Sequence, residues 1–338
     1  DWSSDVCSSD LVAWDAQSFF SLRRNINKIN LVLPEWFFID PVADTVYVNT
    51  NEVQRGMDFM KNSGVKIMPV LSNNFQGKFR PEAVSRIFKS SEKRKKLIDY
   101  VLNECIKNKF IGINVDLEDL KENGDEPMIE FMKELSAAFK SKGLLITQDI
   151  SPFNEDFNYK ELSKYNDYLF LMAYDEYSND SDPGPISSQK WIEAAVDLAA
   201  KEVSSKKIIL CIAGFGYDWG AKGEAEDITY QQALIKARES DADVDFDNDS
   251  YNLHFTYDDD NDSLHQVYLT DAATNFNTLR FATEYGLAGT ALWRLGSEDS
   301  RLWDFYNKDM RKEALRKFDF NNFNQVESSN DEIGRAHV

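Results

Sequence analysis

Several residue types are scarce in this chain of 338 residues. Lysine and arginine total 38 against 58 aspartates and glutamates, so the formal net charge at pH 7 is −20. Such an acidic surface repels nucleic-acid phosphates and anionic lipid headgroups, so we expect neither as a partner. No apolar run approaches the roughly 20 residues that a membrane-spanning helix needs. Histidine occurs three times; His254 and His265 have neither HExxH nor paired spacing, and we expect no metal and no other cofactor.

Cysteine is equally sparse. Cys105 and Cys211 lie in apolar segments without CxxC spacing, which predicts buried free thiols. Cys7 belongs to the opening DWSSDVCSSDL, which, like the closing EIGRAHV, resembles translated sequencing-adapter sequence. We therefore expect residues 1–11 and 332–338 to be adapter artefacts, and residues 309–331 to be a linker toward a missing downstream domain. A targeting segment would then not be present in this fragment.

Short apolar runs alternate with amphipathic stretches along the rest of the chain. The expected strands are 11–15, 29–39, 64–72, 110–118, 143–150, 167–175, 207–216 and 287–296. The expected helices include 52–63, 91–108, 126–142, 159–164, 187–203, 274–285 and 299–308. Continuous apolar strands separated by helices are typical of a parallel sheet covered by helices, and eight such units predict an α/β fold, a (β/α)₈ TIM barrel over residues 12–308. An open doubly wound sheet is the alternative, but the first turn lacks GxGxxG.

One polar stretch interrupts this alternation. Residues 220–262 are rich in Asp, Asn, Glu and Ser, and we expect them to form a small insertion between strand 7 and helix 7. The acidic runs 245–250 and 258–262 could bind calcium or form a solvated hairpin. The hairpin is favoured because the twelve-residue calcium-loop pattern ending in glutamate is absent.

Polar residues at the strand ends are the candidates for catalysis, since active sites of such barrels lie at the C-terminal ends of the strands. The fourth strand ends with Asn114, Asp116 and Glu118, which the two-residue period places on one face. Mutual repulsion and partial burial should raise the pKa of one carboxyl, and we expect this to be Glu118. A carboxyl that stays protonated near neutral pH can act as a general acid.

Other strand ends add groups that suit a sugar. Aromatic side chains stack on the apolar face of a pyranose ring, while polar side chains hold its hydroxyls. The candidates from neighbouring strands are Met172, Tyr174 and Asp175, then Gln148 and Asp149, then Trp293. Trp36, Tyr217 and Trp219 are further candidates for binding sugar units.

The spacing of the two acids limits the mechanism. A retaining glycosidase with two carboxylates places them about 5 Å apart on opposite sides of the scissile bond. Neighbours on one strand share a side, so Asp116 is poorly placed to attack opposite Glu118. A 2-acetamido sugar solves this, because its carbonyl oxygen can attack the anomeric carbon. Asp116 would then orient the acetamido nitrogen, and the Tyr174 hydroxyl would bind its oxygen.

These segments resemble family 18 of the glycoside hydrolases, the chitinase-like family. INVDLE resembles the strand-four signature DGxDxDxE, LMAYD resembles the strand-six MxYD, and ALWRLGSED resembles the strand-eight tryptophan segment. The resemblance covers about Val12 to Tyr306. It is greatest to a bacterial branch that includes spore-cortex hydrolases, and within it to domains fused to a polysaccharide deacetylase and a glycosyltransferase, on VLPEWFFID, SNN, TQDISPFN and PGPISSQKWIE.

The resemblance implies a role for each matching residue. It makes Glu118 the catalytic acid, Asp116 the residue that orients the acetamido group, Tyr174 its oxygen contact, Trp293 the floor of the −1 subsite and Asp175 a hydroxyl ligand. It implies retaining, substrate-assisted hydrolysis of β-1,4-linked N-acetylglucosamine-containing polysaccharide, outside the cell or at its envelope, by part of a larger multidomain chain.

The sequence also departs from the family pattern. Ile111 and Asn114 replace the first two aspartates of the signature, and LSNN replaces a glycine-rich strand-three motif. Asn114 cannot take up charge beside Asp116, so activity should be lower or its pH dependence altered. A glycan-binding module without catalysis, serving fused enzymes, therefore stays open as an alternative. An unrelated aldolase-like or phosphate-binding barrel is disfavoured, since no inward-facing lysine pattern and no phosphate loop occur.

Overall fold

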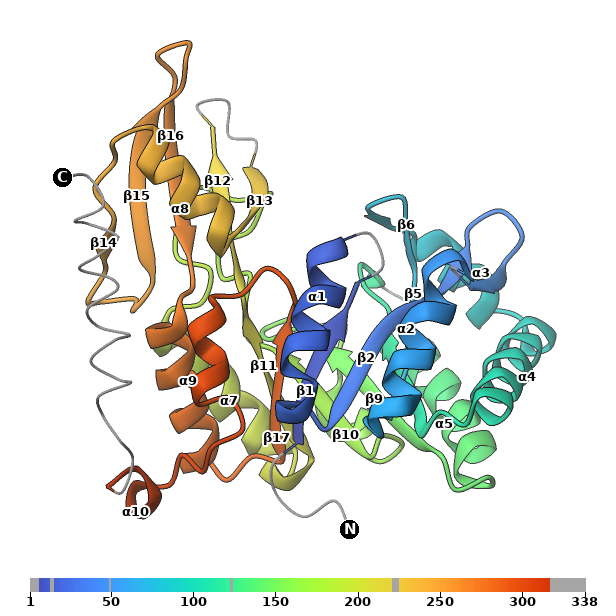
Figure 1. The fold of residues 1–338 in the computed structure, drawn as a ribbon. Helices are drawn as coiled ribbons and strands as arrows, with labels where there is room; N and C mark the ends of the chain where they lie inside the picture. Colours follow the sequence, from blue (N-terminus) through green and yellow to red (C-terminus); the bar gives the residue numbers. More distant parts are fainter. Residues whose placement is uncertain (1–5, 13–14, 49, 122–123, 221–224, 317–338) are drawn as a thin grey trace.

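Eight parallel strands close into a barrel in the computed structural model, which describes residues 6–12, 15–48, 50–121, 124–220 and 225–316 (Figure 1). In sequence order the barrel strands are β1 (Val6–Leu11), β2 (Leu31–Asp40), β5 (Val70–Ser72), β8 (Gly112–Asp116), β9 (Leu145–Ile150), β10 (Tyr168–Met172), β11 (Ile208–Ala213) and β17 (Gly289–Trp293). Each pairs with its sequence neighbours, and β1 pairs with both β2 and β17, which closes the ring. The predicted TIM barrel is confirmed.

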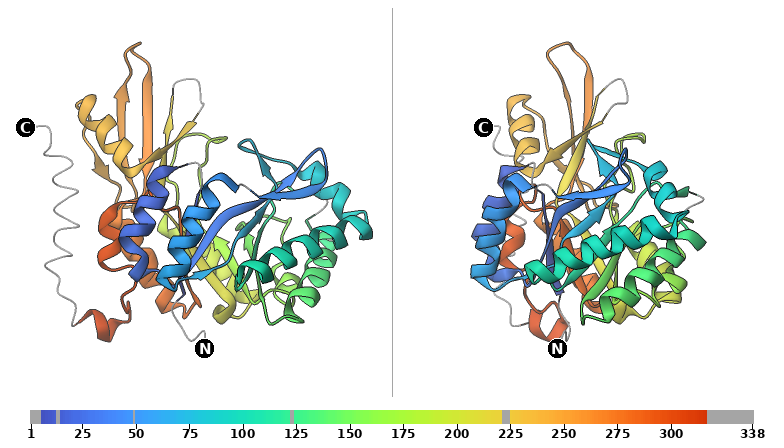
Figure 2. Two further views of the ribbon diagram at one scale, coloured as in Figure 1. Left: turned by 45° about the vertical axis from the view of Figure 1, so that its right-hand side comes forward. Right: turned by 90° about the vertical axis from the view of Figure 1, so that its right-hand side faces the viewer.

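Helices cover the outside of this ring (Figures 1 and 2). They are α1 (Ala16–Asn25), α2 (Thr50–Ser63), α3 (Pro81–Phe88), α4 (Ser91–Asn108), α5 (Glu126–Lys140), α6 (Tyr159–Leu162), α7 (Gln189–Glu202) and α9 (Ala272–Glu284). Their ends follow local chemistry: the Ser90 side chain accepts a hydrogen bond from the Lys93 N–H at the start of α4, and Lys109 ends that helix with φ 61°. Within the described ranges, no helix combines the length and hydropathy of a membrane span.

Alternation along the strands separates two apolar cores. Outward side chains such as Ile113 and Ile146 pack against the helices. Inward side chains such as Leu33, Val70 and Phe170 fill the barrel itself. Because this inner cluster closes the barrel below, the polar side chains at the C-terminal ends of the strands line an open mouth above it.

The predicted insertion lies between β11 and α9, and rises beside the mouth (Figure 1). It is an antiparallel sheet of β12 (Phe215–Trp219), β13 (Ala225–Thr229), β14 (Asp245–Phe246), β15 (Leu253–Asp258) and β16 (Leu264–Leu269), with α8 (Tyr230–Glu239) on one face. Its elements therefore extend beyond the expected 220–262. The acidic run 258–262 forms the turn between β15 and β16, as the hairpin interpretation predicts.

Two predicted elements are wrong. The first strand is Val6–Leu11 rather than 11–15, because Asp15 is already the N-cap of α1, where it accepts from the Gln17 N–H; residues 13–14 lie outside the described residues. The expected final helix 299–308 is only a 3₁₀ turn, η4 (Ser300–Asp304). Asp299 is its N-cap and Phe305 its C-cap, so the turn does not continue into a helix. The adapter origin of residues 1–11 and 332–338 stays a prediction, and the latter lie outside the described residues.

Smaller elements were not anticipated. They are the strands β3 (Thr45–Val48), β6 (Asn74–Phe75) and β7 (Lys78–Phe79), the helices α3 and α10 (Lys312–Leu315), and the 3₁₀ turns η1 (Ile26–Lys28) and η3 (Ser205–Lys207). The strand expected over 64–72 is divided into β4 (Lys66–Ile67) and β5. The β6–β7 hairpin follows β5 directly and lies at the mouth end of the barrel (Figure 1).

Candidate active site

Two carboxyl groups meet where β8 ends. Asp116 is the last residue of that strand and lies opposite Ser72 of β5 in the strand register. Its carboxyl is hydrogen-bonded to the side chains of Ser72 and Glu118. The other carboxyl oxygen, Oδ1, is buried without a partner among the described residues. The predicted juxtaposition of Asp116 and Glu118 is therefore present, with one acceptor left to receive a hydrogen bond.

Burial dominates the protonation of this pair. It raises the pKa of Asp116 to about 6, while the hydrogen bonds from Ser72 and Glu118 oppose the rise. The pKa of Glu118 is raised well above its ordinary value, first by burial and then by the negative charges of Asp116 and Asp149. Since two adjacent buried carboxyls resist double ionisation, the pair retains a proton near neutral pH, and Glu118 is the better holder.

Three side chains of β8 and β9, those of Asn114, Thr147 and Asp149, form a hydrogen-bonded group next to this pair. Asn114 donates from Nδ2 to Asp149 Oδ2 at 2.6 Å, and the Thr147 hydroxyl donates to Asn114 Oδ1 at 2.6 Å. Burial and the charge of Asp116 raise the pKa of Asp149, against the Asn114 hydrogen bond. Asn114 is only 1% exposed. Both ends of its amide are engaged by Thr147 and Asp149, and the expected contact of Asn114 with substrate stays a prediction.

The end of β10, two strands along the barrel from β8, supplies the next part of the wall. Asp175 follows that strand with φ 63° and accepts a hydrogen bond from the Tyr217 hydroxyl at 2.8 Å. Partial loss of surrounding water raises the pKa of Asp175 to about 6, which the Tyr217 hydrogen bond opposes. Tyr174 lies close enough to Asp149 and Asp175 for their charges to raise its phenol pKa, although burial is the larger cause. The acids of β8, β9 and β10 thus converge with one phenol.

Aromatic rings continue from this wall into the insertion. Tyr174, Phe215 and Tyr217 pack edge to face, with ring centroids 5.9 and 5.4 Å apart along the series. The half-buried Trp293 belongs to the same cluster. Met172 lies in the inner barrel core. Trp219 is only 1% exposed, and its ring packs against Tyr217 rather than lying open to a sugar.

Two predicted site residues face away from the mouth. Trp36 is 3% exposed and packs in the outer core against Phe110, with ring centroids 5.9 Å apart. Gln148 is fully buried, and its Oε1 accepts from Asn166 Nδ2 at 2.9 Å. Alternation explains both corrections, because the inward positions are taken by the preceding Glu35 and the following Asp149.

Glu35 is a mouth residue that the motifs missed. It continues the inward series of Leu31 and Leu33 on β2 and is 8% exposed. Burial raises its pKa well above the ordinary value, the Asp116 charge raises it further, and the Arg294 charge opposes this. The alternation from Leu31 was the signal that could have found it. Asp10 of β1 also contributes a buried carboxyl of raised pKa, but it lies in the segment predicted to be an adapter artefact.

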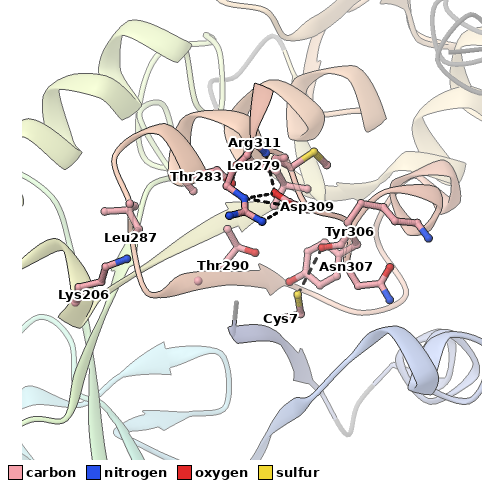
Figure 3. A pocket seen from close by; sticks show the side chains of 15 residues that line it. Cys7, Lys206, Leu279, Thr283, Leu287, Thr290, Tyr306, Asn307, Asp309 and Arg311 are labelled. Carbon is pink, nitrogen blue, oxygen red and sulfur yellow. Dashed lines mark hydrogen bonds and ion pairs between the residues drawn. The ribbon is translucent and has the colours of Figure 1, made fainter. Parts of the chain in front are cut away.

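A pocket at the other end of the barrel is separate from this site. It lies at the N-terminal ends of β1 and β17, beside the C-terminal end of α9, and includes Cys7, Lys206 and Arg311 among its lining residues (Figure 3). Arg311 there is bonded to Asp309 at 2.8 Å. Across the described part of the chain, no group of three or more His, Cys, Asp or Glu side chains is arranged to hold a metal ion.

Comparisons with known proteins agree with the barrel fold. The model of the family described as "Glycosyl hydrolases family 18" matches residues 21–299. The uncharacterized glycosylase YvbX of Bacillus subtilis is 22% identical over 87% of this chain and 88% of its own length. The cortical fragment-lytic enzyme of the same organism is 21% identical over 72% of this chain and 60% of its length. A chitinase structure from Chromobacterium violaceum superimposes with TM-score 0.82 at 23% identity, covering 89% of this chain and 97% of that one.

Proposed function

The chain belongs to family 18 of the glycosyl hydrolases and is an O-glycosyl hydrolase, and from this we propose that it cleaves β-1,4-linked N-acetylglucosamine-containing glycan at the barrel mouth. The glycan is a chitin-like or peptidoglycan-type polymer, lying outside the cell or in its envelope. The relative named cortical fragment-lytic enzyme supports that class of substrate. We also propose that the domain works as part of a larger chain with other polysaccharide-processing domains.

The proposed mechanism retains the anomeric configuration. Glu118 gives its proton to the glycosidic oxygen, and the C1–O bond breaks as the substrate's acetamido carbonyl oxygen bonds to C1. The products are a protonated oxazoline ring on one part of the glycan and the released part of the glycan, which keeps the glycosidic oxygen as a hydroxyl group. Glu118, now a carboxylate, takes a proton from water as the water oxygen bonds to C1 on the face that the leaving group occupied. The bond between C1 and the ring oxygen of the oxazoline breaks, which restores the acetamido group. Glu118 ends protonated, ready for another cycle.

Two other residues act on the acetamido group. Asp116 accepts its N–H, which holds the carbonyl oxygen toward C1 and stabilises the positive charge on the ring nitrogen. The Tyr174 hydroxyl donates to the acetamido oxygen. Trp293 supplies the apolar floor beneath the sugar, and Asp175, held by Tyr217, accepts from a sugar hydroxyl. Met172, like Tyr174, packs against the inner barrel core.

One observation carries this proposal. Asp116 has a hydrogen-bonded oxygen toward Ser72 and Glu118 and a second, buried oxygen without a partner in the described chain. A buried acceptor left unpaired costs free energy that an incoming N–H recovers. An acetamido sugar brings such an N–H next to the protonated Glu118, whereas a sugar with a plain 2-hydroxyl brings no nucleophilic carbonyl.

The runner-up function is glycan binding without turnover. It is favoured by Asn114, which stands where the family signature has an aspartate and is committed to Thr147 and Asp149, so it cannot take up charge beside Asp116. Such a module would bind the same polymer for neighbouring enzymes.

The test is turnover of defined glycans by the full chain. We expect it to release shorter oligomers from N-acetylglucosamine oligomers or peptidoglycan, with the β-anomer formed first by NMR. Glu118→Gln should lower kcat by roughly 10²–10⁴-fold, the usual contribution of general acid catalysis. Tight binding of the same oligomers with no turnover would instead establish the binding module, and full activity of Glu118→Gln would remove Glu118 from the mechanism.

A further inference from the structure

Asn73 holds the main chain of Glu118 from both sides. Its Oδ1 accepts from the Glu118 N–H at 2.9 Å, and its Nδ2 donates to the Glu118 carbonyl at 2.9 Å. Asn73 follows β5 directly, and its side chain is fully buried. Its own carbonyl accepts from the Arg80 N–H at 3.0 Å, which ties Asn73 to the end of the β6–β7 hairpin. Both the donor and the acceptor of the Asn73 amide thus bind the main chain of Glu118.

This arrangement matters because Glu118 lies outside regular structure. β8 ends at Asp116, and the following chain turns through Asp119 with φ 58° and Lys121 with φ 51°. The sheet ladder therefore does not fix the peptide groups on either side of the Glu118 Cα. Two hydrogen bonds to its N–H and C=O fix them instead, and they determine the direction of the Cα–Cβ bond and hence where the carboxyl points.

The amide side chain suits this task for a simple reason. It presents a donor and an acceptor at the spacing of a peptide group, so it pairs with Glu118 as a neighbouring strand would. Aspartate keeps the acceptor but replaces the donor with an oxygen that faces the Glu118 carbonyl. Leucine has a similar volume but leaves both buried backbone groups unpaired, at a cost of about 1–3 kcal/mol each.

We propose that Asn73 is a positioning residue that aims the Glu118 carboxyl at the glycosidic oxygen. This inference rests on the proposed function for its kinetic consequence but not for its structural one. General acid catalysis requires the acid within hydrogen-bond reach of the leaving oxygen, and a displacement of about 1 Å can cost roughly 100-fold in rate. For a leaving group that departs without a proton, the cleavage rate should not depend on where the Glu118 carboxyl points.

The kinetic test compares two substrates. Asn73→Leu and Asn73→Asp should each lose roughly 100-fold in kcat/KM on an N-acetylglucosamine oligomer, but less than about threefold on the 2,4-dinitrophenyl glycoside of the same sugar. The matched control is Asn74→Asp, the same chemical change one residue along. Asn74 accepts from the Gly77 N–H within the hairpin, which aspartate can still do, and we expect near-normal kcat/KM on both substrates.

A structural readout is independent of activity. Crystal structures of the two Asn73 variants should show the Glu118 backbone rotated and its carboxyl displaced, with Asp116 unmoved. The inference is overturned if the carboxyl stays in place, if both substrates lose activity equally, or if neither does. Should Asn73→Leu not fold, Asn73→Asp alone decides between these results. If the wild-type chain cleaves neither substrate, the proposed function fails, and the crystal structures still decide the role of Asn73.

Discussion

At the scale of single residues, the mouth gives similar carboxyl groups different protonation states through their surroundings. Asp116 accepts hydrogen bonds from Ser72 and Glu118, which favour its ionised form and limit its pKa to about 6. Glu118 faces the charges of Asp116, Asp149 and Asp175, which favour its protonated form. Separation of two neighbouring pKa values is what assigns an acid and an anion in catalytic pairs.

This separation predicts how activity should depend on pH. The basic limb of the kcat/KM profile reports loss of the Glu118 proton in the free enzyme. Asp116→Asn removes the charge that contributes most to raising that pKa after burial, so the limb should move to lower pH. Asp175→Asn removes a smaller contribution and should move it less. Profiles on one oligomer measure both, and an equal or reversed order would contradict the assigned electrostatics.

The direction of a side chain on a barrel strand could be predicted where the alternation of inward and outward residues was applied. It was predicted incorrectly where neighbouring residues were both assigned to the inside. Alternation with apolar neighbours brings Asp116, Glu118 and Tyr174 to the same end of the barrel, whereas their catalytic roles stay predictions. Gln148 and Asp149 are adjacent, so they cannot both face inward, and Gln148 faces outward toward Asn166. Trp36 packs in the outer core, and the preceding Glu35 faces inward. Asn73 was beyond reach, since its function depends on which backbone lies beside it rather than on its spacing from another motif residue.

At the scale of elements, the insertion is fastened to the barrel by polar side chains. Asn252, which directly precedes β15, is fully buried. Its Oδ1 accepts from the N–H groups of Ile186 and Ser187 at 3.1 and 3.3 Å, and its Nδ2 donates to the Ser187 carbonyl at 2.9 Å. This fixes the chain between β10 and α7 against the same insertion whose Tyr217 holds Asp175.

Removing this anchor should loosen one wall of the site. Asn252→Ala leaves two N–H groups and one carbonyl unpaired, so we expect a loss of stability of about 2–4 kcal/mol. KM should rise more than kcat falls, because the wall binds sugar whereas Glu118 is held elsewhere. Thermal unfolding and steady-state kinetics measure these effects. Asn261→Ala, in the exposed β15–β16 turn, is the control; an equal effect of both variants would show that Asn252 is no anchor.

The order of elements could be predicted because buried parallel strands must be apolar along their length, as in segments 207–216 and 287–296. The first strand of the barrel does not follow this rule. β1 carries VCSSDL, a polar strand that no periodicity identifies and that only the closure of the ring places between β2 and β17. The final helix was overestimated because a buried 3₁₀ turn and a helix share the same short apolar spacing.

At the scale of the whole molecule, negative charge is abundant and partly concentrated inward. The net charge is −20, and the mouth holds Glu35, Asp116, Asp149 and Glu118, all with raised pKa values. A carboxyl whose pKa is higher in the folded state binds more protons there than in the unfolded chain. Its effect on stability is therefore favourable below the folded pKa and is lost as pH rises through it. Catalytic acids thus lower stability at neutral pH.

The free energy of unfolding should accordingly be greater at mildly acidic pH than at neutral pH. For Asp116 and Asp175 the sensitive window runs from the unfolded value near 4 to about 6. The raised pKa values of Glu35 and Asp149 act in the same direction. We expect Tm at pH 5.5 to exceed Tm at pH 7.5 by roughly 3–5 °C. Added salt should narrow this difference by screening the overall charge.

A charge-matched pair of variants separates the mouth from the overall charge. Glu35→Gln keeps the side-chain shape but removes one buried carboxyl, so it should raise Tm at pH 7.5 by about 2 °C and leave Tm at pH 5.5 nearly unchanged. Glu155→Gln alters net charge equally at an exposed position and should change Tm little at either pH. If both variants raise Tm at pH 7.5 by the same amount, self-repulsion of the whole surface, and not burial of acids in the mouth, determines the pH dependence.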